Sequence, residues 1–179
     1  MVFRNETWNN TGDIVVYSNY HKYWLDRERK IKNPLFDVFS GKILDLKNGQ
    51  ESAVNYFFNL IDNEICDDVT ICVVPSSDSN KINTGMTKLG EKLAQNGRKD
   101  KVHFLVREKT IEKLSTGGNR SKFIHMDSIG TLQDMSVKGD VVLLMDDVTT
   151  TGNSLYACKD ILLAHGAQNV EMFALGKAI

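Results

Sequence analysis

Blocks of apolar residues separated by polar segments run through the last two thirds of the chain. Short apolar runs predict buried strands, and stretches with apolar side chains every three or four positions predict helices with one buried face. By these criteria we expect strands at residues 69–74, 102–106, 141–145 and 170–175, and helices at 50–63, 84–96 and 155–165. Strands that alternate with helices pair in parallel through right-handed crossovers. The expected fold class is therefore α/β, with a parallel sheet flanked by helices.

The first 48 residues have a different pattern. A short strand is expected at 14–17, and the apolar runs 36–39 and 42–46 are separated by a Ser-Gly pair at a spacing that suits a β-hairpin. Between these segments, aromatic side chains are interleaved with lysine and arginine. We expect residues 1–48 to form a small N-terminal hood or cap, and residues 49–179 to form the α/β core.

Composition and charge exclude several classes of protein. With 179 residues and 41% apolar content, the chain can bury one hydrophobic core but hardly two. A net charge of −1 gives no overall basic field, so a nucleic acid partner is not indicated. No apolar run approaches the ~18 residues of a membrane span, and the polar start lacks the apolar core of a signal peptide, so we expect a cytoplasmic protein. The three cysteines lack metal-binding spacing and are expected to be structural thiols.

The strand predicted at 141–145 ends at two adjacent carboxylates, which a hydroxyl-rich loop follows. Backbone N–H groups at the start of the next helix lack partners within the helix and carry a partial positive charge, so a phosphate can bind there. Gly152 lets the backbone approach that phosphate closely. Asp146 and Asp147 can accept hydrogen bonds from a sugar, directly or through a hydrated Mg²⁺. The phosphate-binding candidates are Thr149, Thr150, Thr151, Gly152, Asn153 and Ser154.

A simpler interpretation of the same residues is an acidic turn in which threonine and serine cap the next helix. Capping would explain one hydroxyl group, but not four hydroxyl or amide side chains around a glycine after paired acids. We therefore prefer the phosphate site.

Residues 141–154 resemble the phosphoribosyl pyrophosphate (PRPP) signature of type I phosphoribosyltransferases. That signature has a short apolar run, two acids, an apolar residue and a Thr/Gly-rich phosphate loop, and the order and spacing agree. The resemblance implies that Asp146 and Asp147 hold the ribose hydroxyls and Mg²⁺ during catalysis, while the loop wraps the 5′-phosphate. In the 6-oxopurine enzymes the position of Thr150 is usually an aspartate that assists the base. Its replacement counts against hypoxanthine or guanine as the acceptor.

A second polar loop follows the strand predicted at 69–74 and is expected at the same edge of the sheet. In the family the corresponding loop receives the pyrophosphate, and the candidates here are Ser76, Ser77 and Lys81. An ordinary polar connection between a strand and a helix explains these residues equally well.

The polar segment at 107–129 is where a mobile active-site loop is expected. Twin glycines among cations suit a lid that closes over a polyanion, and its cations would stabilise the departing pyrophosphate. The candidates are Arg107 for PRPP binding, and Lys113 and Arg120 as catalytic lid cations. A solvated connection is the alternative, although a long loop in a compact domain is more often functional. For His125 we favour a surface or capping histidine over an acid/base group.

Within the family, the layout resembles the branch related to competence protein ComF. The shared features are Val74-Pro75, Arg107 and Thr110, the motif from Asp146 to Gly152, and a chain that stops after the strand at Val170 to Leu175. Two features differ: no four-cysteine zinc ribbon precedes the core, and Lys-Ile-Asn-Thr at 81–84 replaces the Arg-Gly-Phe-Asn of that branch. That branch has no well-fixed substrate, so the acceptor stays open.

The family resemblance also implies that the hood sets the acceptor. Its aromatic side chains could stack on a base, or they could pack the hood onto the core, which we favour; they are Tyr17, Tyr20, Tyr23 and Trp24. The cations Arg27, Arg29 and Lys30 could contact phosphates.

These features favour a phosphoribosyltransferase-type enzyme that binds PRPP with Mg²⁺ and transfers the 5-phosphoribosyl group to an unidentified nitrogenous acceptor, with release of pyrophosphate. The expected partners are PRPP and a small-molecule base, without a membrane, and the family is compatible with a homodimer. The alternative is a non-catalytic PRPP- or nucleotide-sensing module that acts through a protein or nucleic acid partner. A kinase or NTPase is disfavoured because the Walker-type lysine loop is missing.

Overall fold

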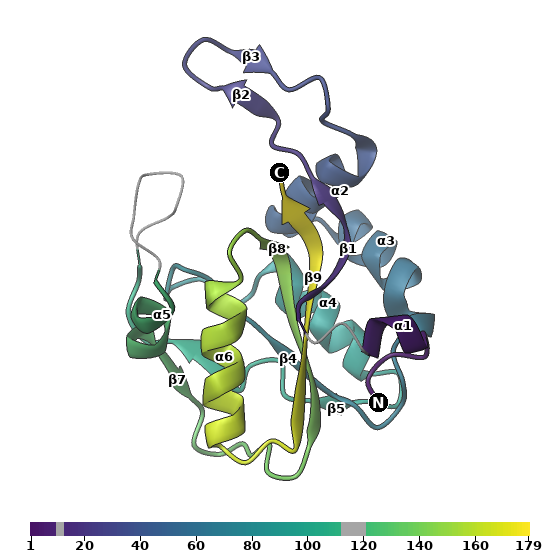
Figure 1. Cartoon of the computed structure of the whole chain (residues 1–179), viewed down its shortest axis with the longest axis vertical. Coiled ribbons are helices and arrows are strands. Elements are labelled where there is room, and N and C mark those ends of the chain that lie inside the picture. The colour runs from purple at the N-terminus through teal and green to yellow at the C-terminus, as the bar shows by residue number, and fades with distance from the viewer. Residues whose placement is uncertain (10–12, 112–120) are drawn as a thin grey trace.

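Five parallel strands form the centre of the fold (Figure 1). The computed structural model describes residues 1–9, 13–111 and 121–179. In spatial order the strands are β1 (Val15–Tyr20), β9 (Asn169–Ala178), β8 (Val141–Thr149), β4 (Thr70–Val73) and β5 (Lys99–Asp100). Each neighbouring pair is parallel, and helices connect the strands of the core. The predicted α/β class, a parallel sheet flanked by helices, is confirmed.

Helices cover both faces of this sheet (Figure 1). One face carries α2 (Val38–Lys47), α3 (Glu51–Ile61) and α4 (Gly85–Ala94), and the other carries α6 (Asn153–Ala164). Alternate residues of β8 divide between the two cores, because successive side chains of a strand point to opposite faces. Leu143 and Met145 join the first core, and Val142 and Leu144 join the second. Burial on both faces explains the unbroken apolar run that precedes the acid pair.

The remaining elements are short and lie outside the central sheet. They are α1 (Glu6–Asn9), β2 (Trp24–Asp26), β3 (Ile31–Lys32), the 3-10 helix η1 (Asp62–Glu64), β6 (Leu105–Arg107), α5 (Lys122–Ser128) and β7 (Ile129–Thr131). β2 and β3 form an antiparallel arm that projects beyond α2 at the top of Figure 1, and β6 pairs with β7. Within the described ranges, no helix has the length and apolar character that crossing a membrane requires.

The structure corrects two predicted elements. The β-hairpin expected at 36–46 is wrong, because this segment contains the single helix α2. Asp37 caps this helix by accepting a hydrogen bond from the Ser40 N–H at 2.7 Å, and the buried residues Ser40, Ile43 and Leu46 recur at helical spacing. The strand expected at 102–106 is β6, which pairs with β7, whereas the strand beside β4 is β5.

Part of the first 48 residues belongs to the central sheet. β1 pairs with β9, and Val2 and Phe3 are buried in the core. The division into hood and core at residue 48 stays a prediction, and the arm is the part of this segment that projects from the sheet in Figure 1.

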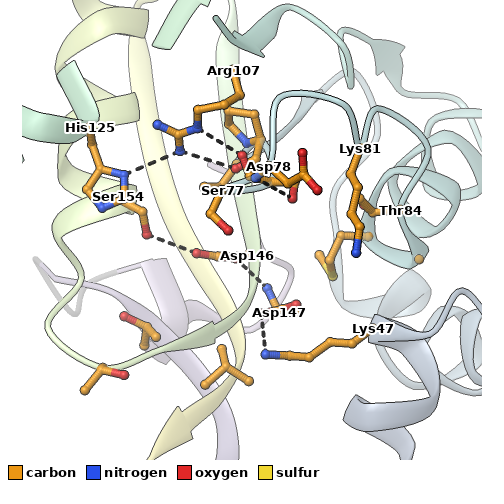
Figure 2. A pocket seen from close by; sticks show the side chains of 18 of the residues that line it. Lys47, Ser77, Asp78, Lys81, Thr84, Arg107, His125, Asp146, Asp147 and Ser154 are labelled. Atoms are coloured by element: carbon orange, nitrogen blue, oxygen red, sulfur yellow. Dashed lines mark hydrogen bonds and ion pairs between the residues drawn. The ribbon is translucent and has the colours of Figure 1, made fainter. Parts of the chain in front are cut away.

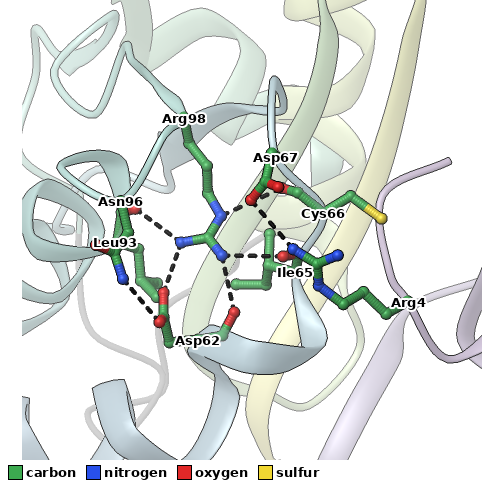
Figure 3. Close-up of polar contacts among 8 residues, drawn as sticks. All are labelled: Arg4, Asp62, Ile65, Cys66, Asp67, Leu93, Asn96 and Arg98. Atoms are coloured by element: carbon green, nitrogen blue, oxygen red, sulfur yellow. Dashed lines mark hydrogen bonds and ion pairs between the residues drawn. The ribbon is translucent and has the colours of Figure 1, made fainter.

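A buried guanidinium group ties the end of α4 to the segment after α3 (Figure 3). The Arg98 side chain is only 2% exposed and pairs with the Asp62 carboxylate at 2.6 Å. It also donates to the backbone carbonyl oxygens of Asp62, Leu93, Ile65 and Cys66. A buried charge is tolerated when its hydrogen bonds are complete, so this cluster fixes the turn that leads into β4.

The three cysteines are free thiols. Cys72 and Cys158 are buried in the core, and this burial raises the pKa of both thiols. Their structural role, as predicted, is that of small buried apolar side chains.

Candidate functional site

A cleft of about 560 Å³ opens at the carboxyl ends of β4 and β8 (Figure 2). Parallel strands place the loops that follow them at one edge of a sheet, which brings the two predicted loops together. Every predicted site residue in the described ranges lines this cleft: Ser76, Ser77, Lys81, Arg107, Asp146, Asp147, Thr149, Thr150, Thr151, Gly152, Asn153 and Ser154. The predicted lid cations Lys113 and Arg120 lie outside the described residues.

The loop between β8 and α6 has a backbone geometry that suits a bound anion. Gly152 is the N-cap of α6 with a φ of 78°, in the left-handed region that glycine adopts without strain. A Cβ atom at this position would lie 2.4 Å from Ile14 Cδ1 and 2.9 Å from Tyr156 Cε2. No side chain forms a capping hydrogen bond at Gly152, so the simpler capping interpretation does not describe this loop. The amino end of α6 faces the cleft without a side-chain cap at its N-cap position.

The two carboxylates of the motif have different surroundings (Figure 2). The Ser154 hydroxyl donates to Asp146 Oδ2 at 3.2 Å, and the Asp147 N–H donates to Asp146 Oδ1 at 2.8 Å. Asp147 instead pairs with Lys47 Nζ at 3.3 Å. Since successive strand residues point to opposite faces, Asp146 lies on the α6 side and Asp147 on the α2 side.

Burial and, next in size, the negative charge of Asp147 raise the pKa of Asp146 to about 7. This value includes the opposing effects of the Asp147 N–H, Lys47 and Ser154, each of which lowers the pKa. The charged form of Asp146 is therefore unfavourable in the ligand-free cleft, and a bound cation or hydrogen-bond donor would relieve this.

Arg107, the last residue of β6, holds the loop at 75–81 in place through hydrogen bonds (Figure 2). The Arg107 Nε donates to the Ser76 carbonyl oxygen at 2.9 Å, and Nη2 donates to the Pro75 carbonyl oxygen at 3.5 Å. Its Nη1 donates to Ser128 Oγ at 2.5 Å, and Nη2 lies 3.4 Å from His125 Nδ1. Arg107 lines the cleft as predicted, but these contacts give it a role in positioning the loop.

The amino end of α4 also faces the cleft. Thr84 is its N-cap, and the Thr84 hydroxyl accepts a hydrogen bond from the Thr87 N–H at 3.2 Å. Thr84, Gly85 and Met86 line the cleft opposite the loop that begins α6. Two helix amino ends therefore meet at one site, and both favour negative charge.

Several cleft residues were not singled out from the sequence. Lys47 and Asn48 enter from the end of α2, which had been assigned to a hairpin, and a helical assignment would have placed them at this edge. His125 is not the surface histidine of the prediction, because the residue is 3% exposed and lies beside Arg107, whereas the capping alternative stays a prediction for this side chain in the last turn of α5. α5 places it there, and its spacing in the sequence gave no signal of this.

The three threonines of the motif differ in exposure. Thr150 and Thr151 are exposed. The Thr149 hydroxyl oxygen is buried and has no hydrogen-bond partner in the described part of the chain. Thr150 and Thr151 are thus better placed to donate to a ligand than Thr149.

The donor set fits Mg²⁺ that arrives with a phosphorylated ligand. Across the described ranges, no group of three or more His, Cys, Asp or Glu side chains is arranged to hold a metal ion. Mg²⁺ in proteins is usually held by one or two carboxylates together with substrate phosphates and water. The carboxylates of Asp146 and Asp147 match that mode.

Comparison with known proteins gives structural similarities only. No protein-family model matches the sequence, and a search of curated proteins finds no significant match. A hypoxanthine phosphoribosyltransferase from Staphylococcus aureus is similar over 76% of this chain and 74% of its own, with 14% identity and a TM-score of 0.43. A phosphoribosylpyrophosphate synthetase from Mycobacterium smegmatis is similar over 73% of this chain, with 20% identity and a TM-score of 0.38. This chain spans 33% of that protein. A hypoxanthine phosphoribosyl transferase from Trypanosoma cruzi is similar over 78% of this chain and 66% of its own, with 14% identity and a TM-score of 0.39. At such scores, any functional assignment must come from the cleft itself.

Proposed function

We propose that this chain is a type I phosphoribosyltransferase-like enzyme that binds PRPP with Mg²⁺ and transfers the 5-phosphoribosyl group to a nitrogenous acceptor. The observation that carries this proposal is a pair of carboxylates between the amino ends of α4 and α6 in one cleft. Helix amino ends attract phosphate groups, and carboxylates accept hydrogen bonds from sugar hydroxyls. PRPP is a ribose with a phosphate at one end and a pyrophosphate at the other, so it matches a carboxylate pair placed between two helix amino ends. The motif residues also support placement in the ComF-related branch.

Two loops and the carboxylate pair have roles in the proposed complex. The loop at 150–154 would bind the 5′-phosphate, and Asp146 and Asp147 would accept hydrogen bonds from the ribose and hold Mg²⁺. Bound Mg²⁺ would supply positive charge that neutralises the pyrophosphate oxygens. Ser76, Ser77 and Lys81 would donate to the pyrophosphate, and Arg107 would keep their loop in position.

The proposed reaction exchanges two bonds at ribose C1. The lone pair of the acceptor nitrogen forms the new bond to C1, while the bond from C1 to the pyrophosphate oxygen breaks and its electron pair leaves with pyrophosphate. Positive charge develops on the sugar in an oxocarbenium-like transition state, and negative charge develops on the leaving group. The Lys81 ammonium group would stabilise the leaving group, and the two carboxylates would stabilise the sugar.

Calorimetric titration with PRPP, with and without Mg²⁺, tests the binding step. We expect binding that depends on Mg²⁺ and weakens at least about tenfold in Asp147→Asn, since hydrogen bonds to charged groups contribute roughly 1.5–3 kcal/mol. Asp45→Asn is a matched control, because Asp45 lies on α2 and pairs with Lys42. Release of pyrophosphate with a panel of nitrogenous acceptors then tests transfer. If PRPP does not bind, the proposal fails.

The projecting arm favours one alternative, a non-catalytic PRPP sensor that acts through a macromolecular partner. Leu25 and Ile31 on this arm are 64% and 47% exposed. Exposed apolar side chains on a projecting element suit an interaction surface. PRPP binding without pyrophosphate release on any acceptor would favour the sensor.

A further inference from the structure

The cleft offers an acceptor no large aromatic side chain for stacking. Among the described residues that line it there is no Phe, Tyr or Trp. Residues 10–12 and 112–120, which the structure does not describe, contain none in their sequence. Stacking on aromatic rings is a recurrent way to bind a nucleobase and contributes roughly 1–3 kcal/mol per base. A neutral base would have to bind here without it.

Tyr17 and Tyr20 pack on the core, as favoured from the sequence, whereas Tyr23 and Trp24 pack within the arm. The Tyr17 ring stacks on Phe39 at a centroid distance of 5.9 Å. Tyr23 contacts Trp24 and Phe36 within the arm, at 4.7 and 5.0 Å. Tyr20, beside the cleft, is only 8% exposed. None of these rings lines the cleft.

This inference rests on the proposed function, which assigns no role to the end of α2. The loop at 150–154 is assigned to the 5′-phosphate, and the loop at 75–81 to pyrophosphate. Among the cleft residues without an assigned role, Lys47 at the end of α2 pairs with the carboxylate of Asp147, and Asn48 lines the cleft next to it in the sequence. Lys47 Nζ lies 3.3 Å from Asp147 Oδ1, and the Lys47 side chain is 38% exposed, so a ligand in the cleft can reach it.

Close backbone contacts hold the end of α2 in place. A Cβ atom at Gly85 would lie 1.9 Å from the Leu46 carbonyl oxygen, so the start of α4 touches the backbone just before Lys47. A Cβ atom at Gly176 would lie 2.8 Å from Ile43 Cδ1, so β9 approaches the same helix closely. Because such packed contacts leave little freedom, the Lys47 ammonium group is presented at a fixed edge of the cleft.

We propose that Lys47 determines acceptor specificity and that the acceptor carries a carboxylate beside its nucleophilic nitrogen. In the ligand-free protein the Lys47 ammonium group pairs with Asp147 (Figure 2). When Asp147 binds the ribose, this ammonium group turns to the acceptor carboxylate, which it matches in charge and hydrogen-bonding capacity. The acceptor nitrogen attacks C1, pyrophosphate leaves with the electron pair of the broken bond, and the proton of the attacking N–H group passes to solvent.

The test compares nitrogen heterocycles with and without a ring carboxylate as acceptors, using the full chain with Mg²⁺ and PRPP. Initial rates of pyrophosphate release are measured for the wild type, Lys47→Gln, Lys47→Arg and Lys42→Gln. Lys42 is a matched control because it lies on the same helix, pairs with Asp45 at 3.8 Å and lies 5.9 Å from the Tyr56 ring centroid. The PRPP dissociation constant of each variant is measured separately by calorimetry.

We expect the wild type to use carboxylated acceptors in preference to neutral ones. Lys47→Gln should lower kcat/KM for carboxylated acceptors roughly ten- to hundredfold more than it lowers kcat/KM for neutral ones. Lys47→Arg should retain part of the preference, and Lys42→Gln all of it. The ratio between the two acceptor classes separates recognition by Lys47 from an indirect effect on PRPP, which would change both rates together.

Three results would overturn this inference, and they differ in whether the proposed function also fails. Release with neutral acceptors only, at a ratio that Lys47→Gln does not alter, would leave the proposed transferase intact. PRPP binding without release on either class would remove transfer as well and leave a sensor. Absence of PRPP binding would remove the proposed function together with the inference.

Discussion

The burial of Asp146 predicts that the ligand-free protein is more stable without this carboxylate. Its pKa is about 7 in the folded chain, against an ordinary value of 3.8. This gap of roughly 3 units corresponds to a ceiling of about 4 kcal/mol at about 1.4 kcal/mol per unit. The cleft is open to water and Lys47 is near, so solvent screening reduces the figure to about 2 kcal/mol.

The sign follows from which state binds the proton more tightly. Because the folded pKa of Asp146 is raised, the folded state holds the proton more tightly than the unfolded state. The resulting stabilisation is fully present below pH ~4 and is lost as the pH rises towards ~7. Asp146→Asn resembles the protonated acid in shape and charge, so it should match the wild type near pH 4. At pH 8 the free energy of unfolding of Asp146→Asn should exceed that of the wild type by about 2 kcal/mol.

Urea unfolding of both proteins between pH 4 and 8, with a chelator and without PRPP, measures this difference. Asp45→Asn on α2 is the control for removal of a surface carboxylate, and should show no such trend. Adding PRPP and Mg²⁺ at pH 8 should stabilise the wild type more than Asp146→Asn, because a ligand stabilises the state to which it binds. An Asp146→Asn variant that is no more stable than the wild type at pH 8 would refute the reasoning.

Three further predictions concern other parts of the fold. Arg98→Met should lower the free energy of unfolding by roughly 3–5 kcal/mol in urea titrations, because it removes the ion-pair partner of Asp62 and the donor to four backbone carbonyl oxygens. Arg4→Met, at an exposed pair, should change the free energy of unfolding by less than about 1 kcal/mol. Gly152→Ala should destabilise the protein by about 1–3 kcal/mol and weaken PRPP binding. Adding Ile14→Ala should recover part of the stability, because the second substitution removes the 2.4 Å clash with Ile14 Cδ1 but leaves the strain of the positive φ. Arg107→Lys should weaken binding of pyrophosphate roughly tenfold in calorimetry with little effect on ribose 5-phosphate, because it loosens the loop at 75–81 alone; equal losses for both ligands would contradict this.

The motif strand and its neighbours could be predicted from the sequence because a strand that is buried on both faces appears as a continuous apolar run. The run at 141–145 is apolar throughout, and in the structure its residues divide between the two cores. Once the strands were taken as parallel, the loops after β4 and β8 had to meet at one edge. The site therefore followed from the topology, without knowledge of any individual side-chain contact.

The end of α2 could not be found in the same way, because the apolar residues at 36–46 fit two short strands about as well as one helix. Asp37 is a local N-cap signal for the helix, but it does not settle that choice. A further contact of α2 is long-range: the Ser40 hydroxyl is buried and accepts a hydrogen bond from the His21 N–H at 3.0 Å. His21 is far from Ser40 in the sequence, so this contact leaves no local pattern. Lys47 was missed as a consequence, since a hairpin would not have carried it to the cleft.

The unequal surroundings of the two acids explain why a site of this kind tolerates adjacent carboxylates. Asp147 pairs with Lys47, while burial and the negative charge of Asp147 raise the pKa of Asp146. The ligand-free cleft thus holds less negative charge than two aspartates would suggest, and an incoming polyanion meets less repulsion. In the proposed complex, Mg²⁺ and the sugar would add to the partners that Asp146 and Asp147 already have in Ser154 and Lys47. Such binding would relieve the electrostatic cost of the ligand-free cleft, and would therefore link the pH dependence of stability to ligand affinity through the same two side chains.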